Sequence, residues 1–221
     1  MKLTLTISLL TLASLGALSQ SNRFAAANHN GPAAKKIITT PKHALKAQSF
    51  KVDNASSKLT WLAKKATGEH SGNVKVSEGT FVIDGTTLKS GSFTIDTKSI
   101  TVTDVTDAST NGKLLGHLKS DDFFSTEKFP TSTFVITSAK KGSGNQYNLT
   151  GKLTIKGITN EVSFPAAIDV AGKKLIAKAK ITIDRTKYDI KFRSKNFFEN
   201  LGDKVIYDDF DIDVALVANA G

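Results

Sequence analysis

Few side chains in this sequence could do acid–base or metal chemistry. The chain has no cysteine, and only two of its four histidines, His70 and His117, lie beyond residue 47. Because a histidine without a cysteine partner makes a poor transition-metal site, we predict no metal site. His70 has two interpretations, contact with a bound ligand or haem, or a hydrogen bond at the start of a strand. His117 is expected to pack, or to pair with a charge, near the end of a helix, and a position facing the barrel mouth is the alternative.

Two pairs of neighbouring carboxylates, Asp121-Asp122 and Asp208-Asp209, are the next candidates. Adjacent side chains usually diverge, so neither pair is suited to shared acid–base work. The sequence also lacks the patterns of a Ser-His-Asp set, a nucleophile elbow, a phosphate loop and a zinc motif. We therefore predict that the protein is not an enzyme. The alternative is a lyase or isomerase whose site is assembled from distant residues of a barrel, and no residue pattern supports it.

The elements that must position any site are mostly strands. Apolar and polar residues alternate with a period of two, as in Tyr147, Leu149, Gly151, Leu153 and Ile155, and glycine-rich turns separate such stretches. One helix is expected over 107–119, with Asp107 as its N-cap. About eight strands are predicted, over 49–53, 57–66, 71–83, 86–97, 132–140, 145–156, 159–170 and 173–183, with a last long one over 204–218.

Regularly spaced antiparallel strands predict an all-β fold, an eight-stranded barrel with one short helix near 107–119. The alternative of an outer-membrane barrel needs long uniform strands and aromatic girdles, and its apolar face points to lipid. Here the Lys/Thr/Asp face is expected outside in water and the apolar face inside. A barrel of this size either fills with side chains or holds one ligand.

The N-terminal residues indicate export. Residues 1–19 are predicted to be a signal peptide, because a short uncharged apolar run precedes small residues at Ala17-Leu18-Ser19. No cysteine follows this run, so a lipoprotein is excluded, and the mature chain is expected in the periplasm or secreted without a transmembrane segment. Residues 20–47 are predicted to be a disordered basic linker and residues 48–221 the barrel domain.

The net charge of +10 is partly a property of the N-terminal segment. Six of the thirty basic residues and none of the twenty acidic ones lie before residue 47, so the domain carries +4. The basic residues do not form a stripe with stacking aromatics, and we predict no binding to nucleic acid.

Four ordered motifs resemble the YceI family. They are the run from Ser92 to Phe134 with its LLGHLKSDDFF core, GKLTIKGITNEVSFP from Gly151, IDRTKYDI from Ile183, and LGDKVIYDDFDIDVAL from Leu201. The resemblance implies a lipocalin-like barrel over about residues 50–218 that holds an isoprenoid-type lipid, a polyprenyl chain or quinone. It also implies a head-group role for Arg185, although a strand-end arginine bridging to backbone carbonyls, Asp184 or Asp203 fits equally well.

The candidate lipid-binding residues share an apolar character and an expected inward direction. Small residues among the inward positions, Gly151, Ala166, Ala177 and Ala179, favour an unfilled interior. The alternative is a stress-related or interaction module with a filled core and no ligand. No cofactor other than a bound lipid is predicted, and pairing into a homodimer is left open. The lipid-binding candidates are Trp61, Phe81, Phe93, Ile95, Leu114, Leu118, Phe123, Phe124, Phe134, Leu153, Ile155, Phe164, Ala177, Ala179, Ile181, Tyr188, Phe210 and Ile212, and the head-group candidates are Arg185 and His70.

Overall fold

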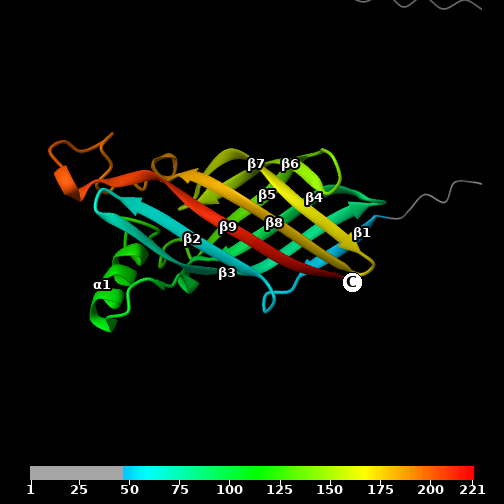
Figure 1. The fold of residues 1–221 in the computed structure, drawn as a ribbon, viewed down its shortest axis with the longest axis horizontal. Coiled ribbons are helices and arrows are strands. Elements are labelled where there is room, and N and C mark those ends of the chain that lie inside the picture. Colours follow the sequence, from blue (N-terminus) through cyan, green and yellow to red (C-terminus); the bar gives the residue numbers. More distant parts are fainter. Residues whose placement is uncertain (1–46) are drawn as a thin grey trace, which may run out of the picture. The chain divides into compact units, whose positions relative to one another are not determined.

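The computed structural model describes residues 47–221, which form an antiparallel β-barrel with one α-helix (Figure 1). The predicted signal peptide and nearly all of the predicted linker lie outside the described residues. The helix α1 is Ala108–Lys119, and short 3₁₀ turns η1, η2 and η3 cover Thr97–Ser99, Arg185–Tyr188 and Gly202–Lys204. The strands are β1 Gln48–Val52, β2 Lys58–Lys65, β3 Gly68–Asp84, β4 Thr87–Asp96, β5 Thr131–Lys141, β6 Gln146–Ile155, β7 Ile158–Ala171, β8 Lys174–Asp184 and β9 Ile206–Ala220.

The barrel has eight strand positions although it contains these nine strands, because β1 and β2 share one position. Both lie between β3 and β9: β2 pairs with the first half of β3, as in Leu59 with Val74, and β1 pairs with the second half, as in Phe50 with Phe81. Pairing of β3 with β4 closes the circle. The predicted eight-stranded antiparallel barrel is therefore confirmed.

The alternation in sequence becomes an inside and an outside of the barrel wall. On β6, the side chains of Tyr147, Leu149, Leu153 and Ile155 are buried while Lys152 is exposed. The hydrophobic effect fixes this register, because a slip by one residue would turn the apolar set into water.

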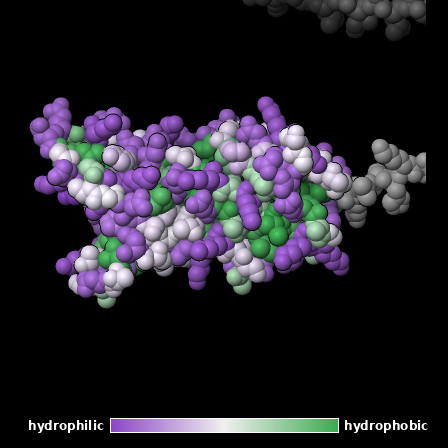
Figure 2. Space-filling model, viewed as in Figure 1, coloured by the Kyte–Doolittle hydropathy of each residue, from purple (hydrophilic) through white to green (hydrophobic). Residues whose placement is uncertain are grey.

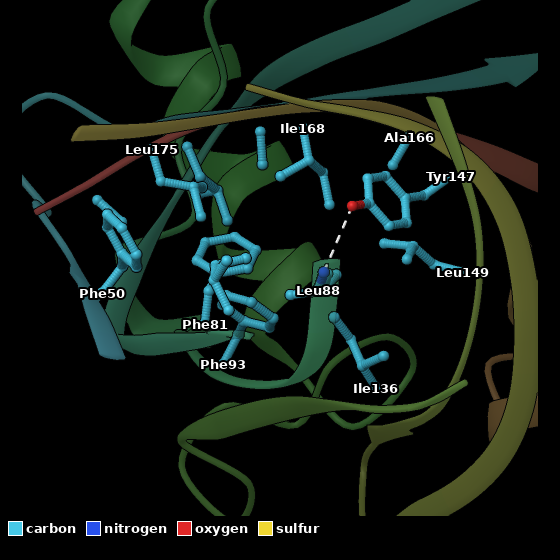
Figure 3. Packing of buried hydrophobic residues seen from close by; sticks show 14 of the residues in the cluster. Phe50, Phe81, Leu88, Phe93, Ile136, Tyr147, Leu149, Ala166, Ile168 and Leu175 are labelled. Atoms are coloured by element: carbon cyan, nitrogen blue, oxygen red, sulfur yellow. Dashed lines mark hydrogen bonds between the residues drawn. The ribbon is translucent and has the colours of Figure 1, made fainter. Parts of the chain in front are cut away.

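One end of the barrel is filled by side chains and is called the packed end here. Phe50, Leu175 and Ala218 are fully buried there, and Leu88 lies against Tyr147. Figure 3 shows Phe50, Leu175, Leu88 and Tyr147 among the side chains that fill the interior, with the backbone N–H of Leu88 donating to the Tyr147 hydroxyl at 3.4 Å. The interior is solid at this end.

The opposite end, called the α1 end, carries the helix and the segment 185–205 (Figure 1). The chain leading into α1 runs along the first half of β3, where Thr101 N–H donates to Asn73 O and Thr103 N–H to Ser71 O, both at 2.9 Å. Asp107 then caps the helix by accepting from Thr110 N–H at 2.8 Å, as the sequence predicted.

Candidate binding cavity

The barrel encloses a cavity of about 210 Å³ with an almost entirely apolar wall. Every strand from β2 to β9 contributes to this wall, together with the end of α1 and the turn that follows it. Of the predicted lipid-binding residues, those that line the cavity are Trp61, Phe81, Phe93, Ile95, Leu118, Phe123, Phe124, Phe134, Leu153, Ile155, Phe164, Ala177, Ala179, Ile181, Phe210 and Ile212.

Four phenylalanine rings form a continuous row along the wall. The ring centroids of Phe81 and Phe93 lie 4.8 Å apart, those of Phe93 and Phe134 6.3 Å, and those of Phe134 and Phe164 5.4 Å. The row extends from β3 across β4 and β5 to β7. A surface of aromatic faces and edges offers contact area but no hydrogen bonds, so it suits a hydrocarbon chain rather than a polar molecule.

Two predicted candidates do not line the cavity. Leu114 lies on α1 and packs against the group formed by Trp61, Ile100 and Val102. Tyr188 is 1 % exposed and packs beside Ile183 and Ile190 in a separate cluster. Its hydroxyl has no hydrogen-bond partner within residues 47–221, and burial raises its pKa. Both belong to the packing that supports the wall.

The small inward residues contribute unequally to the space. Ala166, Ala177 and Ala179 line the cavity as expected. Gly151 does not, because a Cβ there would overlap the ring of Phe134 on the neighbouring strand β5. The volume that glycine leaves free is filled by this ring. Gly151 therefore positions one member of the aromatic row instead of enlarging the cavity.

Arg185 borders the cavity, but its guanidinium faces the protein. The side chain is 4 % exposed, and it donates to three backbone carbonyls: from Nε to Tyr207 at 3.0 Å, from Nη1 to Ile190 at 2.7 Å and from Nη2 to Ile206 at 2.9 Å. Nη2 also lies 3.4 Å from the carboxylate of Asp208. Burial lowers the pKa of Arg185, and the negative charges of Asp208 and Asp184 act in the opposite direction.

This geometry fits the carbonyl-bridging interpretation of Arg185, with Asp208 as its acidic partner in place of the expected Asp184 or Asp203. The side chain of Asp184 instead accepts from Thr186 N–H at 2.9 Å and caps η2. Four of the five guanidinium N–H groups can be satisfied in this way, which leaves little capacity for a ligand head group. The arginine holds η2, the segment after it and the start of β9 together.

Neither His70 nor His117 lines the cavity. His70 Nδ1 lies 2.7 Å from Asp104 Oδ2, and Asp104 Oδ1 accepts from Ser71 N–H at 2.9 Å. The structure therefore fits the hydrogen-bonding interpretation of His70, which lies on β3 beside the segment that leads to α1. His117 Nε2 lies 2.9 Å from Asp122 Oδ2.

His117 also joins the two parts of the α1 end. Its ring packs edge-on against Phe123, whose centroid is 5.0 Å away, and against Phe192, at 4.6 Å. Phe123 follows α1 and lines the cavity, whereas Phe192 belongs to the segment 185–205. The histidine thus connects the helix to that segment at the border of the cavity.

Several residues of the wall were missed by the sequence analysis. Leu59, Val76, Ile136, Leu149, Val214 and Leu216 also line the cavity. The period-two pattern places each of them on an inward face, so the same signal could have found them. Ile190 and Ile206 could not be found in this way, because they lie in or beside irregular segments.

The described residues 47–221 contain no cluster of three or more His, Cys, Asp or Glu side chains that could hold a metal ion. No helix in that part of the chain is long and apolar enough to cross a membrane.

Solved structures with this architecture are known. The Burkholderia cenocepacia protein BcnA superposes with a TM-score of 0.63 at 26 % identity, covering 76 % of this chain and 99 % of BcnA. A polyisoprenoid binding domain from Saccharophagus degradans, implicated in plant cell wall breakdown, superposes with a TM-score of 0.58, covering 79 % of this chain and 99 % of that domain. Its 14 % identity supports a shared fold alone.

Sequence relatives agree with this result. The UPF0312 protein of Photorhabdus laumondii is 36 % identical over 88 residues, 40 % of this chain and 45 % of the relative. Protein YceI of Escherichia coli O157:H7 is 34 % identical over 85 residues, 35 % of this chain and 44 % of that protein. The matches thus span about half the length of these relatives. The family model of the YceI-like domain matches residues 50–218, nearly the whole barrel, and the chain belongs to the YceI-like family.

Proposed function

We propose that this protein is a periplasmic or secreted carrier that holds an apolar isoprenoid-type lipid, a polyprenyl chain or quinone, inside its barrel. The observation that carries the proposal is the closed barrel around an apolar cavity with a row of aromatic rings. Further support comes from the Saccharophagus degradans domain, which has this fold and is named for polyisoprenoid binding. The apolar wall selects for hydrocarbon, and the ligand class rests on that relative and on the family.

The cavity volume sets a condition on this function. About 210 Å³ is below the ~300–1,000 Å³ usual for ligand pockets. A long lipid therefore requires rings of the wall to change rotamer as it enters. Phe134 is suited to move because it is only partly buried, unlike Phe81, which is 2 % exposed. We expect the loaded protein to have a larger interior than the structure described here.

Mass spectrometry of an organic extract from protein purified from its native host tests the proposal directly. One isoprenoid lipid per barrel is expected. Ala179→Phe should block loading, because Ala179 lines the cavity. Ala215→Phe is the matched control, since Ala215 is an exposed residue of the adjacent strand β9. Loss of loading in the first variant alone, with melting temperature retained, supports the carrier.

The alternative of a filled core predicts a different pair of results. If the core is filled, the wild-type protein carries no lipid. Ala179→Phe then overpacks the core and lowers the stability by ~1–3 kcal/mol.

Export is tested separately by N-terminal sequencing of the mature protein. A start near Gln20 is expected, and a retained Met1 would contradict export.

A further inference from the structure

Two adjacent phenylalanines lie exposed at the α1 end. Phe197 is 50 % exposed and Phe198 48 % exposed, in the segment between η2 and β9. Figure 2 shows apolar surface flanked by hydrophilic surface at the tip of the molecule where Figure 1 places this segment. Single exposed apolar residues are ordinary, whereas two large neighbouring rings form a small apolar patch that is available for contact with another surface.

The turn that carries these rings is firmly built. Ser194 is fully buried, and its carbonyl accepts from Phe197 N–H at 3.1 Å and Phe198 N–H at 2.9 Å. Arg193 O accepts from Ile206 N–H at 3.0 Å, and the Asn196 side chain donates to Asp208 at 2.6 Å. These bonds tie the turn to β9, so the exposure of the rings is held in place by the fold.

The turn that carries the rings also carries three basic side chains, one of which lies against Phe197. Residues 191–198 contain three basic and no acidic side chains, and Lys191 Nζ lies 5.0 Å from the centroid of Phe197. Arg193 lies over Phe192 at 5.1 Å, and Lys195 is exposed. Asp189 pairs with Lys191 at 2.7 Å, and Glu199 and Asp203 follow the turn. Two exposed rings on a turn with three basic side chains match the two layers of an anionic bilayer surface, its acyl boundary and its head groups.

The turn also lies next to the cavity wall. Ile190 and Ile206, which flank the segment, line the cavity, and Phe192 contacts His117 beside Phe123. A surface that held Phe197 and Phe198 would therefore lie at the end of the barrel where the helix and this segment meet.

We propose that the turn formed by residues 191–198, with Phe197 and Phe198 at its tip, docks the protein on a bilayer that contains anionic phospholipid. This inference extends the proposed function, because docking would bring the α1 end of the barrel to the source of an apolar ligand. Docking needs only the exposed turn, so the two proposals can fail separately.

Sedimentation with vesicles tests it. Wild-type protein should bind vesicles of equal parts phosphatidylglycerol and phosphatidylcholine, and bind phosphatidylcholine alone more weakly. Phe197→Ser with Phe198→Ser should lower the partition coefficient ~10-fold or more, since binding scales with buried apolar area. Lys195→Glu should lower it by roughly tenfold at low salt, with the difference shrinking at high salt.

Matched controls come from the packed end and the barrel wall. Val170→Ser changes an apolar residue that is 40 % exposed, and Lys173→Glu reverses a charge in the exposed hairpin between β7 and β8. Both should leave vesicle binding unchanged. Equal losses from controls and turn variants, or wild-type protein that ignores phosphatidylglycerol, would overturn the docking site.

Two further measurements separate the possible failures. Light scattering that shows a wild-type dimer and a monomeric Phe197→Ser/Phe198→Ser variant, with vesicle binding retained, would make the turn a self-interface and overturn the proposal. Loading of a polyprenol from detergent micelles should be unaffected in the turn variants. Vesicle binding without any loading would leave docking supported and contradict the carrier function instead.

Discussion

The indole N–H of Trp61 donates a hydrogen bond of 3.0 Å to the carbonyl oxygen of Thr101. This bond joins β2 in the barrel wall to the segment that leads into α1, across the first half of β3. Gly72 makes the approach feasible, because it lies between them on β3 and has no side chain. The position of the helix at the α1 end thus depends on a close contact of backbone with backbone.

Substitution of Gly72 tests that contact. In Gly72→Ala, the added Cβ would overlap the backbone of Thr101 and approach the indole nitrogen, so the segment must move. We expect a loss of ~1–3 kcal/mol of stability, the usual range for overpacking. The emission of Trp61, the single tryptophan, should change in the native state.

Gly116→Ala is the control for this experiment. A Cβ at Gly116 on α1 meets open space, and alanine stabilises a helix by ~0.5–1 kcal/mol over glycine. Urea denaturation should give a lower free energy of unfolding than wild type for Gly72→Ala and a higher one for Gly116→Ala. If Gly72→Ala were as stable as wild type, the contact would not position the segment.

The two leucines of α1 should differ in their effect on a bound lipid. Both leucines pack against the cluster of Trp61, Ile100 and Val102, but only Leu118 also lines the cavity. Leu118→Ser is expected to speed release of a loaded fluorescent polyprenol several-fold more than Leu114→Ser does, at similar cost in melting temperature. Stopped-flow transfer to empty vesicles measures the rate. Equal rates in the two variants would show that the helix moves as a unit.

Arg185 should prove essential to the fold rather than to ligand choice. Arg185→Ala removes the guanidinium that donates to three carbonyls and pairs with Asp208 Oδ1, and loss of a buried charged partner costs ~3–5 kcal/mol. Arg185→Lys should recover only part of this, because an ammonium cannot reproduce the planar fork. Calorimetry gives the stability. Selective loss of polyprenyl phosphate binding, with polyprenol binding kept, would restore the head-group role.

Acid should loosen the segment before α1. Burial raises the pKa of Asp104, but hydrogen bonds from Ser71 N–H and His70 outweigh it, so the pKa lies below its ordinary value of 3.8. The folded state therefore binds the proton less well than the unfolded state. The carboxylate contributes its full stability above about pH 4 and loses it as the pH falls through the lowered pKa.

Asp104→Asn removes this titrating group and supplies the comparison. We expect the variant to be less stable than wild type at neutral pH and to lose less stability between neutral pH and pH 3. Trp61 emission followed against pH reports the segment, because the indole is bonded to Thr101. Parallel acid transitions in both proteins would assign the acid sensitivity to other carboxylates.

The sequence alone predicted those features of the fold that depend on residues close together in the chain. The alternation on β6 and the Asp107 cap of α1 depend on neighbours within a few residues, and both expectations are confirmed. The role of Gly151 depends on the cross-strand position of Phe134, which no single stretch of sequence reveals. The partner of Arg185 likewise depends on how β9 passes η2, which places Asp208 rather than Asp184 or Asp203 at the guanidinium.

The sharing of one strand position by β1 and β2 has a practical consequence for handling the protein. The domain begins and ends at the packed end, where Phe50 pairs with Ala220 and Gly221 N–H donates to Ser49 O at 3.3 Å, away from α1 (Figure 1). A fusion or a sensor-chip linkage at the carboxyl end would therefore present α1 and Phe197 to the solution. The same neighbouring ends make the barrel a candidate for circular permutation with a short joining peptide.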